Sequence, residues 1–247
     1  MKTWVLLRGL ARERGHWGRF PEQLGRDLGV QVLPLDLPGN GARFRERTPP
    51  SIVLLADDCR QQLARTGAAY PVGVLALSLG AMVAVQWAAA APQEVGRLVL
   101  ISTSLRPLCP PHWRLRPPAA ATLLARLLAG DAQRLEAAVL ALTSTRADAA
   151  LLPGWLALRR AHPVTRANAL RQLWAAAHYR APEAAAAPTL LLAGRGDRLV
   201  DHRCSERIAA AWRCRLALHP TAGHDLPLDD ADWTIDQLRR WLAEDSA

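Results

Sequence analysis

Lysine is almost absent from this sequence. Lys2 is the only lysine among 31 basic residues, so arginine carries nearly all of the formal net charge of +9. A basic chain can bind nucleic acid, membrane surfaces or acidic proteins. The arginines are scattered, however, and no basic stripe interleaved with aromatic residues marks a nucleic-acid module. We therefore expect no nucleic-acid partner.

Cysteine is also scarce, with four residues in a chain of 247. Cys59, Cys109, Cys204 and Cys214 show no C-x-x-C spacing and make a poor disulfide framework. A Cys204–Cys214 pair stays open as an alternative, but free thiols are the prediction. The histidines show no metal-ligand spacing either, so we expect neither a metal site nor a cofactor.

Long hydrophobic runs are missing, although half of the residues are hydrophobic. The longest apolar stretches, such as 81–91, are far shorter than the roughly 20 residues of a membrane-spanning helix. The amino-terminal apolar run reaches Arg8 too soon for a secretory signal. We therefore expect a cytoplasmic protein without a membrane span. The length suits one α/β domain with an insertion.

Short apolar runs alternate with amphipathic segments at both ends of the chain. Strands are expected at 3–7, 30–35, 72–77, 98–102, 189–193 and 216–218. Helices are expected at 20–28, 52–66 (capped by Ser51), 81–91, 204–211 and 230–243. Strands that are nearly all apolar and alternate with helices are typical of a parallel sheet covered on both faces. The fold class is therefore α/β, with a mostly parallel sheet of about six strands.

The alternation is interrupted between residues 105 and 182. This segment holds no convincing strand, and its alanine, leucine and arginine residues predict helices at about 119–129, 131–142, 147–160 and 164–178. We therefore divide the chain into a core, residues 1–104 and 183–247, and an inserted helical cap, residues 105–182.

A serine stands between the third expected strand and its helix. The stretch Ala76-Leu77-Ser78-Leu79-Gly80 resembles the nucleophile elbow G-x-S-x-G, with Ala76 in place of the first glycine. Small residues are needed there because the strand and helix backbones pass close together and the serine is held in a strained conformation. Taken alone, the pattern also suits a buried serine without a catalytic role.

An acid and a histidine follow the last two expected strands. Asp197 comes directly after strand 189–193, and His224 follows strand 216–218. The carboxyl ends of parallel strands meet at one edge of a sheet, so both side chains can converge on Ser78. In such a site a histidine acts as the base that activates the serine hydroxyl, and an acid orients that histidine.

Neighbouring polar residues have other expected roles. His219 is a weaker candidate for the base, and Asp36 is expected to be structural in its turn. Asp225, Asp229 and Asp230 are expected to cap the last helix.

The chain resembles a small α/β-hydrolase with a helical cap over essentially its whole length. The resemblance is carried by the elbow, by Gly194, Asp197 and Val200, by Gly223-His224, and by the turn Leu35-Asp36-Leu37-Pro38-Gly39-Asn40-Gly41. The order serine, acid, histidine is also that of the family. The resemblance implies that Ser78 attacks, His224 acts as general base and then acid, and Asp197 orients the imidazole.

The implied activity is cleavage of a small-molecule carboxylic ester through an acyl-enzyme intermediate. A thioester is the alternative substrate, because the same machinery handles both. A hypothesis of another class is a catalytically inactive binding protein on the same fold.

The resemblance also implies an oxyanion hole formed by the backbone N–H groups of Leu10 and Leu79. The family has a histidine where this sequence has Arg8. Arg8 either reproduces the bracing hydrogen bonds of that histidine, which we favour, or reaches the pocket and attracts an anionic group. His16 and Trp17 follow on the same loop and are further candidates for the pocket lining.

The cap holds eleven arginines against three acidic residues. In size and plan the chain is similar to the pimeloyl-carrier-protein methyl ester esterase type of carboxylesterase, which implies an acidic acyl carrier protein as a partner. The candidate contacts are Arg126, Arg134, Arg159, Arg160, Arg166 and Arg171, with a solvated helix face as the alternative. Trp113, Trp155 and Trp174 are candidates for apolar pocket walls or for the core of the cap.

Overall fold

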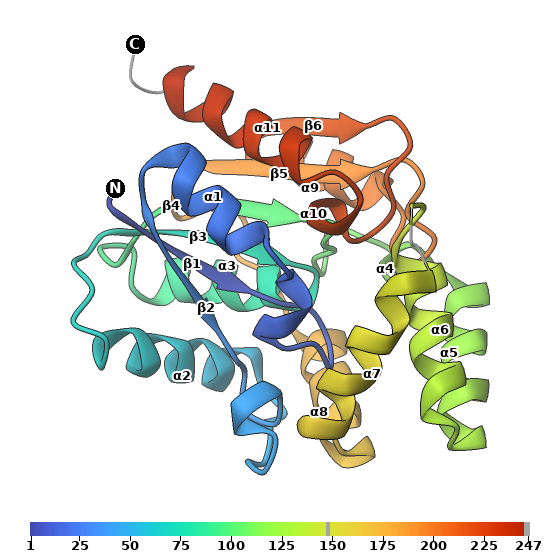
Figure 1. Cartoon of the computed structure of the whole chain (residues 1–247). Helices are drawn as coiled ribbons and strands as arrows, with labels where there is room; N and C mark the ends of the chain where they lie inside the picture. Colours follow the sequence, from blue (N-terminus) through green and yellow to red (C-terminus); the bar gives the residue numbers. More distant parts are fainter. Residues whose placement is uncertain (147–148, 245–247) are drawn as a thin grey trace.

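The core of the protein is a parallel sheet of six strands in the order β2-β1-β3-β4-β5-β6 (Figure 1). The computed structural model describes residues 1–146 and 149–244. The strands are β1 (Thr3–Leu7), β2 (Gln31–Leu35), β3 (Val72–Leu77), β4 (Val95–Ile101), β5 (Thr189–Gly194) and β6 (Arg215–His219). Every neighbouring pair is parallel, which confirms the predicted sheet.

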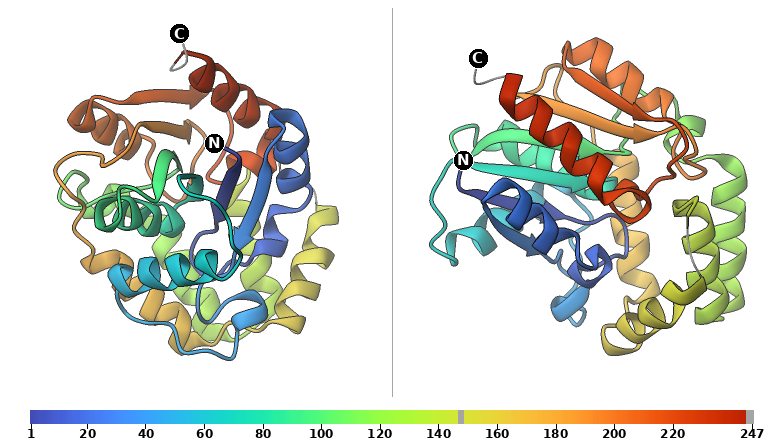
Figure 2. Two further views of the ribbon diagram at one scale, coloured as in Figure 1. Left: turned by 90° about the vertical axis from the view of Figure 1, so that its left-hand side faces the viewer. Right: turned by 45° about the horizontal axis from the view of Figure 1, so that its top comes forward.

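Helices cover both faces of the sheet (Figure 2). One layer holds α1 (Phe20–Leu28) and α11 (Ala231–Glu244), and the other holds α2 (Ile52–Ala64), α3 (Leu79–Ala90) and α9 (Arg203–Trp212). Alternate residues of β1 enter opposite cores: Trp4 packs with α1 and α11, and Val5 packs with α2 and α3. This alternation explains why the strands are apolar along their whole length.

Among the strands, the largest difference from the predicted boundaries is at β4. The strand begins at Val95 instead of at Leu98, because its ladder with β3 starts at the pair Val72–Val95 and continues past the polar Arg97. Backbone pairing therefore extends the strand beyond its apolar run. Gly29 ends α1 in a left-handed conformation, as expected for a C-terminal glycine. Ser51 lies at the N-cap of α2, but its side chain does not make the expected capping bond.

Residues 105–182, the predicted insertion, lie between β4 and β5 in the chain. They contain α4 (Pro111–Arg114), α5 (Pro117–Ala129), α6 (Ala132–Thr143), a 3-10 turn (Ala149–Leu151), α7 (Leu152–Ala161) and α8 (Arg166–His178). The helix expected at 147–160 starts at Leu152, and residues 147–148 lie outside the described residues. Within 105–146 and 149–182 no strand forms beyond one isolated bridge between Arg106 and Arg180.

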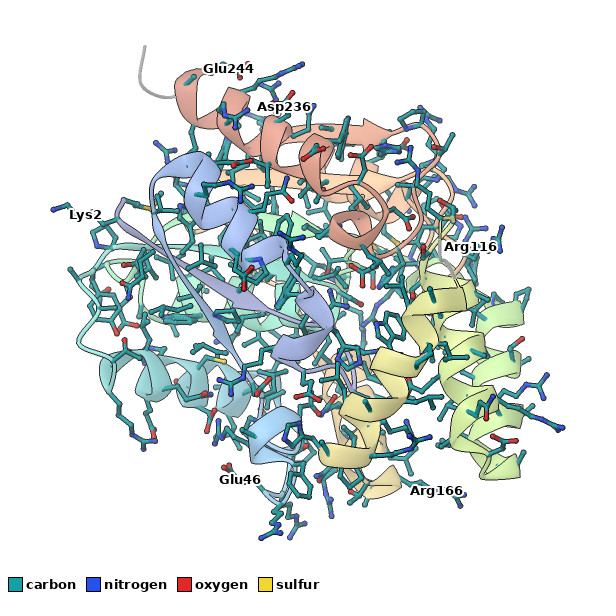
Figure 3. The ribbon with its side chains drawn as sticks, viewed as in Figure 1. Lys2, Glu46, Arg116, Arg166, Asp236 and Glu244 are labelled. Carbon is teal, nitrogen blue, oxygen red and sulfur yellow. The ribbon has the colours of Figure 1, made fainter. Side chains whose placement is uncertain are left out.

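The insertion lies beside the edge of the sheet at which the strand arrows end (Figure 1). Arg116 lies where the insertion meets the core (Figure 3): its backbone N–H donates to the Leu199 carbonyl at 2.9 Å, and its guanidinium lies 3.2 Å from the Asp201 carboxylate. The neighbouring guanidinium of Arg203 also binds Asp201, and together these contacts lower the pKa of that carboxyl to about 2. Among the described helices, none is both long and apolar enough to cross a membrane.

Candidate active site

Ser78 occupies a strained turn between β3 and α3. Its φ of +57° and ψ of −115° are rarely adopted by a residue other than glycine. Two hydrogen bonds hold the turn: Ser78 N–H donates to the Ile101 carbonyl at 2.9 Å, and Thr103 Oγ1 donates to the Ser78 carbonyl at 3.0 Å. A serine held in this way is presented at the carboxyl edge of the sheet.

The small residues around Ser78 allow three backbone segments to meet. A Cβ atom on Gly80 would lie 2.6 Å from the Arg8 carbonyl oxygen, so only glycine fits there without a shift. A Cβ atom on Gly9 would lie 3.3 Å from the Ser78 Cβ. The loop after β1, which carries Leu10, is therefore directly beside Ser78.

Asp197 and His224 form a buried hydrogen-bonded pair. His224 Nδ1 lies 2.8 Å from Asp197 Oδ2, and the two residues are only 3% and 4% exposed, respectively. The other carboxylate oxygen, Oδ1, accepts the backbone N–H groups of Leu199 and Val200 at 2.8 and 2.9 Å. An ionised Asp197 carboxylate can only accept a hydrogen bond, so the His224 ring must carry its proton on Nδ1. The other ring nitrogen, Nε2, then has a lone pair that can accept a proton.

Arg8 connects the loop after β1 to the loop that carries His224. Its guanidinium makes a two-pronged contact with the Asp225 carboxylate, with Nη2–Oδ2 at 2.5 Å and Nη1–Oδ1 at 3.2 Å. It also lies 4.6 Å from the ring centre of Trp17. Both members of the ion pair are buried. The Arg8 guanidinium therefore holds the two loops together. The Asp225 side chain binds Arg8 and makes no capping bond to a helix, so the capping role expected for it is wrong.

Replacing Arg8 with methionine is expected to lower the free energy of unfolding by about 3–5 kcal/mol, because the buried Asp225 carboxylate would lose its countercharge. Urea denaturation measures the change. The double variant Arg8→Met/Asp225→Asn is the matched control and should recover a large part of the loss, since no unpaired charge remains. A loss below about 1 kcal/mol in the single variant would contradict this account.

Asp229 and Asp230 differ from each other. Asp230 does cap α11, since its carboxylate accepts the Trp233 N–H at 3.0 Å. Asp229 instead accepts the N–H of Gly223 at 2.6 Å and that of Thr145, two residues after α6, at 3.1 Å. The Asp229 side chain therefore fastens the insertion to the loop before His224, and the capping role expected for it is wrong. The reason is tertiary, because Thr145 is 84 residues away.

His219 is a structural residue of the same loop. Its Nδ1 accepts the backbone N–H groups of Thr221 and Ala222 at 3.2 and 2.8 Å, and its Nε2 faces the Asp230 carboxylate at 3.3 Å. Asp36 is likewise structural, with its carboxylate accepting the N–H groups of Arg14 and Ala42. Neither side chain is free to act as a base.

His16 and Trp155 form an aromatic contact between the loop after β1 and the insertion. The ring centres are 5.3 Å apart, and the Arg12 guanidinium lies 4.4 Å from the Trp155 ring. Burial, together with the charges of Arg12 and Arg8, lowers the pKa of His16 to about 2. His16 is therefore neutral at physiological pH.

Glu136 is a buried acid that no sequence motif indicates. Its carboxylate binds Arg12 at 2.6 Å and Arg159 at 2.8 Å, joining the loop after β1 to α6 and α7. No sequence motif indicates Arg12 either. Residues from three distant segments make up this cluster, and no local motif marks any of them.

Three of the candidate tryptophans have different surroundings in the structure. Trp17 is buried in the core and stacks on Phe20. Trp113 packs at the junction with α9, beneath the Arg203 guanidinium. Trp174 is 58% exposed on α8. The buried face of that helix is formed by Asn168, Gln172 and Ala175, and Trp174 lies two residues, or about 200°, from Gln172.

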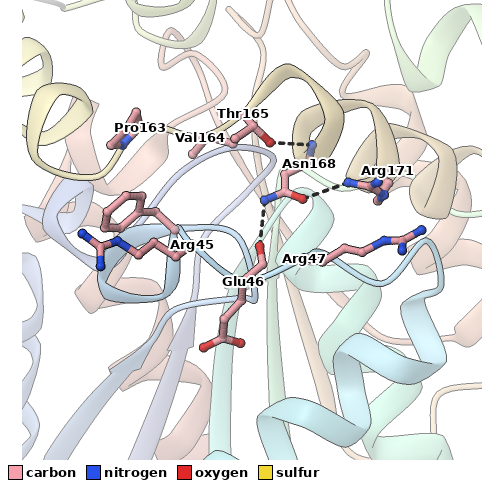
Figure 4. Close-up of a pocket in the computed structure, with 9 residues that line it drawn as sticks. Arg45, Glu46, Arg47, Pro163, Val164, Thr165, Asn168 and Arg171 are labelled. Carbon is pink, nitrogen blue, oxygen red and sulfur yellow. Dashed lines mark hydrogen bonds between the residues drawn. The ribbon is translucent and has the colours of Figure 1, made fainter.

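A surface hollow of about 540 Å³ lies between the loop 44–47 and the start of α8 (Figure 4). Its lining includes Arg45, Arg47 and Arg171, and Asn168 crosses it to bind the Glu46 carbonyl. Ser78, Asp197 and His224 do not line this hollow. Within the described residues, no group of three or more His, Cys, Asp or Glu side chains is placed to hold a metal ion.

Comparison with known proteins agrees with this architecture. The fold is that of the α/β-hydrolases, and the chain belongs to the serine aminopeptidase S33 family, whose profile matches residues 2–231. The protein is therefore a hydrolase of the α/β-hydrolase type.

Relatives and solved structures resemble the chain to different extents. A pimeloyl-[acyl-carrier protein] methyl ester esterase from Chromobacterium violaceum is 33% identical over 102 residues, which is 41% of this chain and 37% of that relative. The match thus spans little more than a third of the relative's length. A thermophilic esterase from Thermogutta terrifontis matches 99% of this chain and 90% of its own, with a TM-score of 0.74 at 20% identity. A hydrolase from Pseudomonas aeruginosa matches 98% of this chain and 89% of its own, with a TM-score of 0.77 at 22% identity. At these identities the two structures show the fold alone.

Proposed function

We propose that the protein is a serine hydrolase that cleaves a carboxylic ester through an acyl-enzyme intermediate. Ser78 Oγ attacks the ester carbonyl carbon while His224 Nε2 takes the hydroxyl proton. The tetrahedral intermediate collapses, and the leaving alkoxide receives that proton from the imidazolium. Water then attacks the acyl-enzyme with His224 again acting as base, and the carboxylic acid is released.

The backbone N–H groups of Leu79 and Leu10 are proposed to bind the oxyanion. Leu79 follows Ser78 directly at the start of α3, and Gly9 brings the loop of Leu10 against Ser78. The insertion, residues 105–182, is proposed to act as a cap over this edge of the sheet.

One observation carries the proposal. The Asp197–His224 pair is buried, and the carboxylate is fixed by two backbone N–H groups as well as by the imidazole. Such a preorganised acid–imidazole pair, at the same edge of the sheet as a strained serine, has the chemistry of acyl transfer. It also argues against an inactive binding protein, as does the engagement of Arg8 with Asp225.

The substrate class is proposed from the partial match to an esterase of carrier-protein-bound substrates. A thioester is the second candidate, because its carbonyl is attacked by the same machinery. Not all of the predicted cap arginines remain equally suitable for an acidic partner. Arg159 is held by Glu136, Arg134 pairs with Asp131 and Arg171 contacts Asn168, so Arg126, Arg160 and the outward-pointing Arg166 (Figure 3) are the better candidates.

A fluorophosphonate probe tests the nucleophile. The wild-type protein is expected to be labelled at Ser78, and the variant Ser78→Ala is expected to show no labelling, because only an activated serine displaces the fluoride. Mass spectrometry of the labelled peptide measures the site. Ser205 is a buried serine on α9 and provides the control, since Ser205→Ala should be labelled like the wild type. Equal labelling of the wild type and Ser78→Ala would overturn the proposal.

A further inference from the structure

Gln172 is a fully buried amide that joins the insertion to the loop beside Ser78. It lies on α8, is 0% exposed, and its Oε1 accepts the backbone N–H of Ala11 at 2.7 Å. Its Nε2 donates to Asn40 Oδ1 at 2.8 Å. Asn40 is equally buried, and its Nδ2 donates to the Arg12 carbonyl at 2.9 Å. The two amides therefore hold both ends of the Ala11–Arg12 segment.

The backbone of the Ala11–Arg12 segment is strained and depends on these hydrogen bonds. Ala11 has a φ of +55°, a left-handed conformation that alanine disfavours. The turn is closed by the Arg12 N–H, which donates to the Gly9 carbonyl at 3.2 Å. Residues 9–12 thus form a tight turn whose geometry is imposed by Gln172 and Asn40 from outside. A turn of this kind persists only where the surrounding structure over-determines it.

Leu10 lies inside this turn, between Gly9 and Ala11. The peptide unit that carries the Leu10 N–H is joined directly to the unit that donates to Gln172. A change in the orientation of the second unit therefore rotates the first. Displacement of an oxyanion donor by a fraction of an ångström weakens its hydrogen bond to the transition state.

We infer that Gln172 is a positioning residue for the oxyanion hole, so that the helical insertion, and not the core alone, sets the geometry of the Leu10 N–H. The inference rests on the proposed serine hydrolase function. It assigns to α8 a role in the chemical step that is separate from substrate recognition by the cap.

The neighbouring amide Asn168 offers a matched comparison. It lies one turn earlier on the same buried face of α8, and it too binds the core, through the Glu46 carbonyl at 2.9 Å and the Thr48 N–H at 3.1 Å. Its hydrogen bonds to the core go to residues 46–48 and not to residues 9–12, although Thr48 Oγ1 also accepts a long hydrogen bond, at 3.5 Å, from Gln172 Nε2. Loss of Asn168 therefore loosens the attachment of α8 without releasing the turn around Leu10.

The test compares Gln172→Met with Asn168→Leu in the full chain, using hydrolysis of a p-nitrophenyl ester. Gln172→Met is expected to lower kcat by about 10- to 100-fold with KM changed less than about threefold. Its affinity for phenylboronic acid, which forms a tetrahedral adduct with a reactive serine, should fall in parallel with kcat/KM. Asn168→Leu should retain kcat within about threefold. Thermal unfolding of both variants identifies any loss that is due only to stability.

Asn40→Leu is a second route to the same turn: it changes a core residue, and it removes both the donor to the Arg12 carbonyl and the acceptor of Gln172 Nε2. It is expected to lower kcat and boronic acid affinity in the same way, so the inference stays testable if Gln172→Met does not fold. Retention of wild-type kcat and boronic acid affinity in folded Gln172→Met or Asn40→Leu would overturn the inference while the proposed function stood. An equal fall in Asn168→Leu would also overturn it. A wild-type protein that neither hydrolyses the ester nor reacts with a fluorophosphonate would overturn the proposed function itself.

Discussion

Replacing His224 with alanine is expected to lower kcat by about 10⁴- to 10⁶-fold, which corresponds to roughly 5–8 kcal/mol of transition-state stabilisation. The imidazole is the only group in the proposed mechanism that takes the Ser78 proton and returns it to the leaving group. Without it the serine hydroxyl stays protonated at neutral pH. Steady-state hydrolysis of a p-nitrophenyl ester measures the change, and KM should move much less than kcat.

His178 provides the matched histidine control for this prediction. It lies exposed at the end of α8, where its ring stacks on Trp174, and it takes no part in the proposed site. His178→Ala should keep wild-type kcat and KM. A folded His224→Ala variant with more than a tenth of wild-type kcat would exclude His224 as the base.

The variant Asp197→Asn is expected to lower kcat by about 10⁴-fold through the wrong imidazole tautomer. In the structure, one carboxylate oxygen of Asp197 accepts the N–H groups of Leu199 and Val200, and the other faces His224 Nδ1. An asparagine must place its oxygen toward the two backbone donors, so its NH₂ group points at Nδ1. The imidazole proton then moves to Nε2, which no longer accepts the proton of Ser78.

Asp236→Asn is the matched control, because the Asp236 side chain is 45% exposed on α11 (Figure 3), where it pairs with Arg239 and takes no part in the proposed chemistry. It should retain wild-type kcat. The substrate affinity of Asp197→Asn should also stay close to that of the wild type, since the substitution keeps size and packing. A folded Asp197→Asn enzyme with kcat within tenfold of the wild type would contradict the orienting role.

Much of the fold could be predicted from local patterns. The strand at 72–77 and the helix at 20–28 have the predicted boundaries, and six parallel strands form the sheet. These elements are short apolar runs and amphipathic segments whose period is visible in neighbouring residues. The start of β4 was not predicted correctly. Its ladder with β3 includes the polar Arg97, so the strand begins before the apolar run that indicated it.

The candidate site was predictable to the extent that it follows strand ends. Ser78, Asp197 and His224 each come after a strand, and in a parallel sheet such positions share one edge. The Asp197–His224 contact at 2.8 Å agrees with that placement. Exposed and buried aromatic positions were not predictable in the same way, and Trp174 is the clearest example. Its environment depends on the side of α8 that the core contacts.

By itself, the sequence determined the α/β class and the hydrolase family resemblance, and it indicated the three residues of the proposed catalytic chemistry, because local apolar runs and short motifs at strand ends mark each of them. Only the tertiary structure decided how those loops are held. Arg8 pairs with Asp225 across 217 residues, and Gln172 binds Ala11 across 161. No local period or motif encodes such contacts, because they arise only when the sheet order and the insertion bring distant loops together. The bracing of the strained turn at Ser78 and its neighbouring loop is therefore a property of the folded chain.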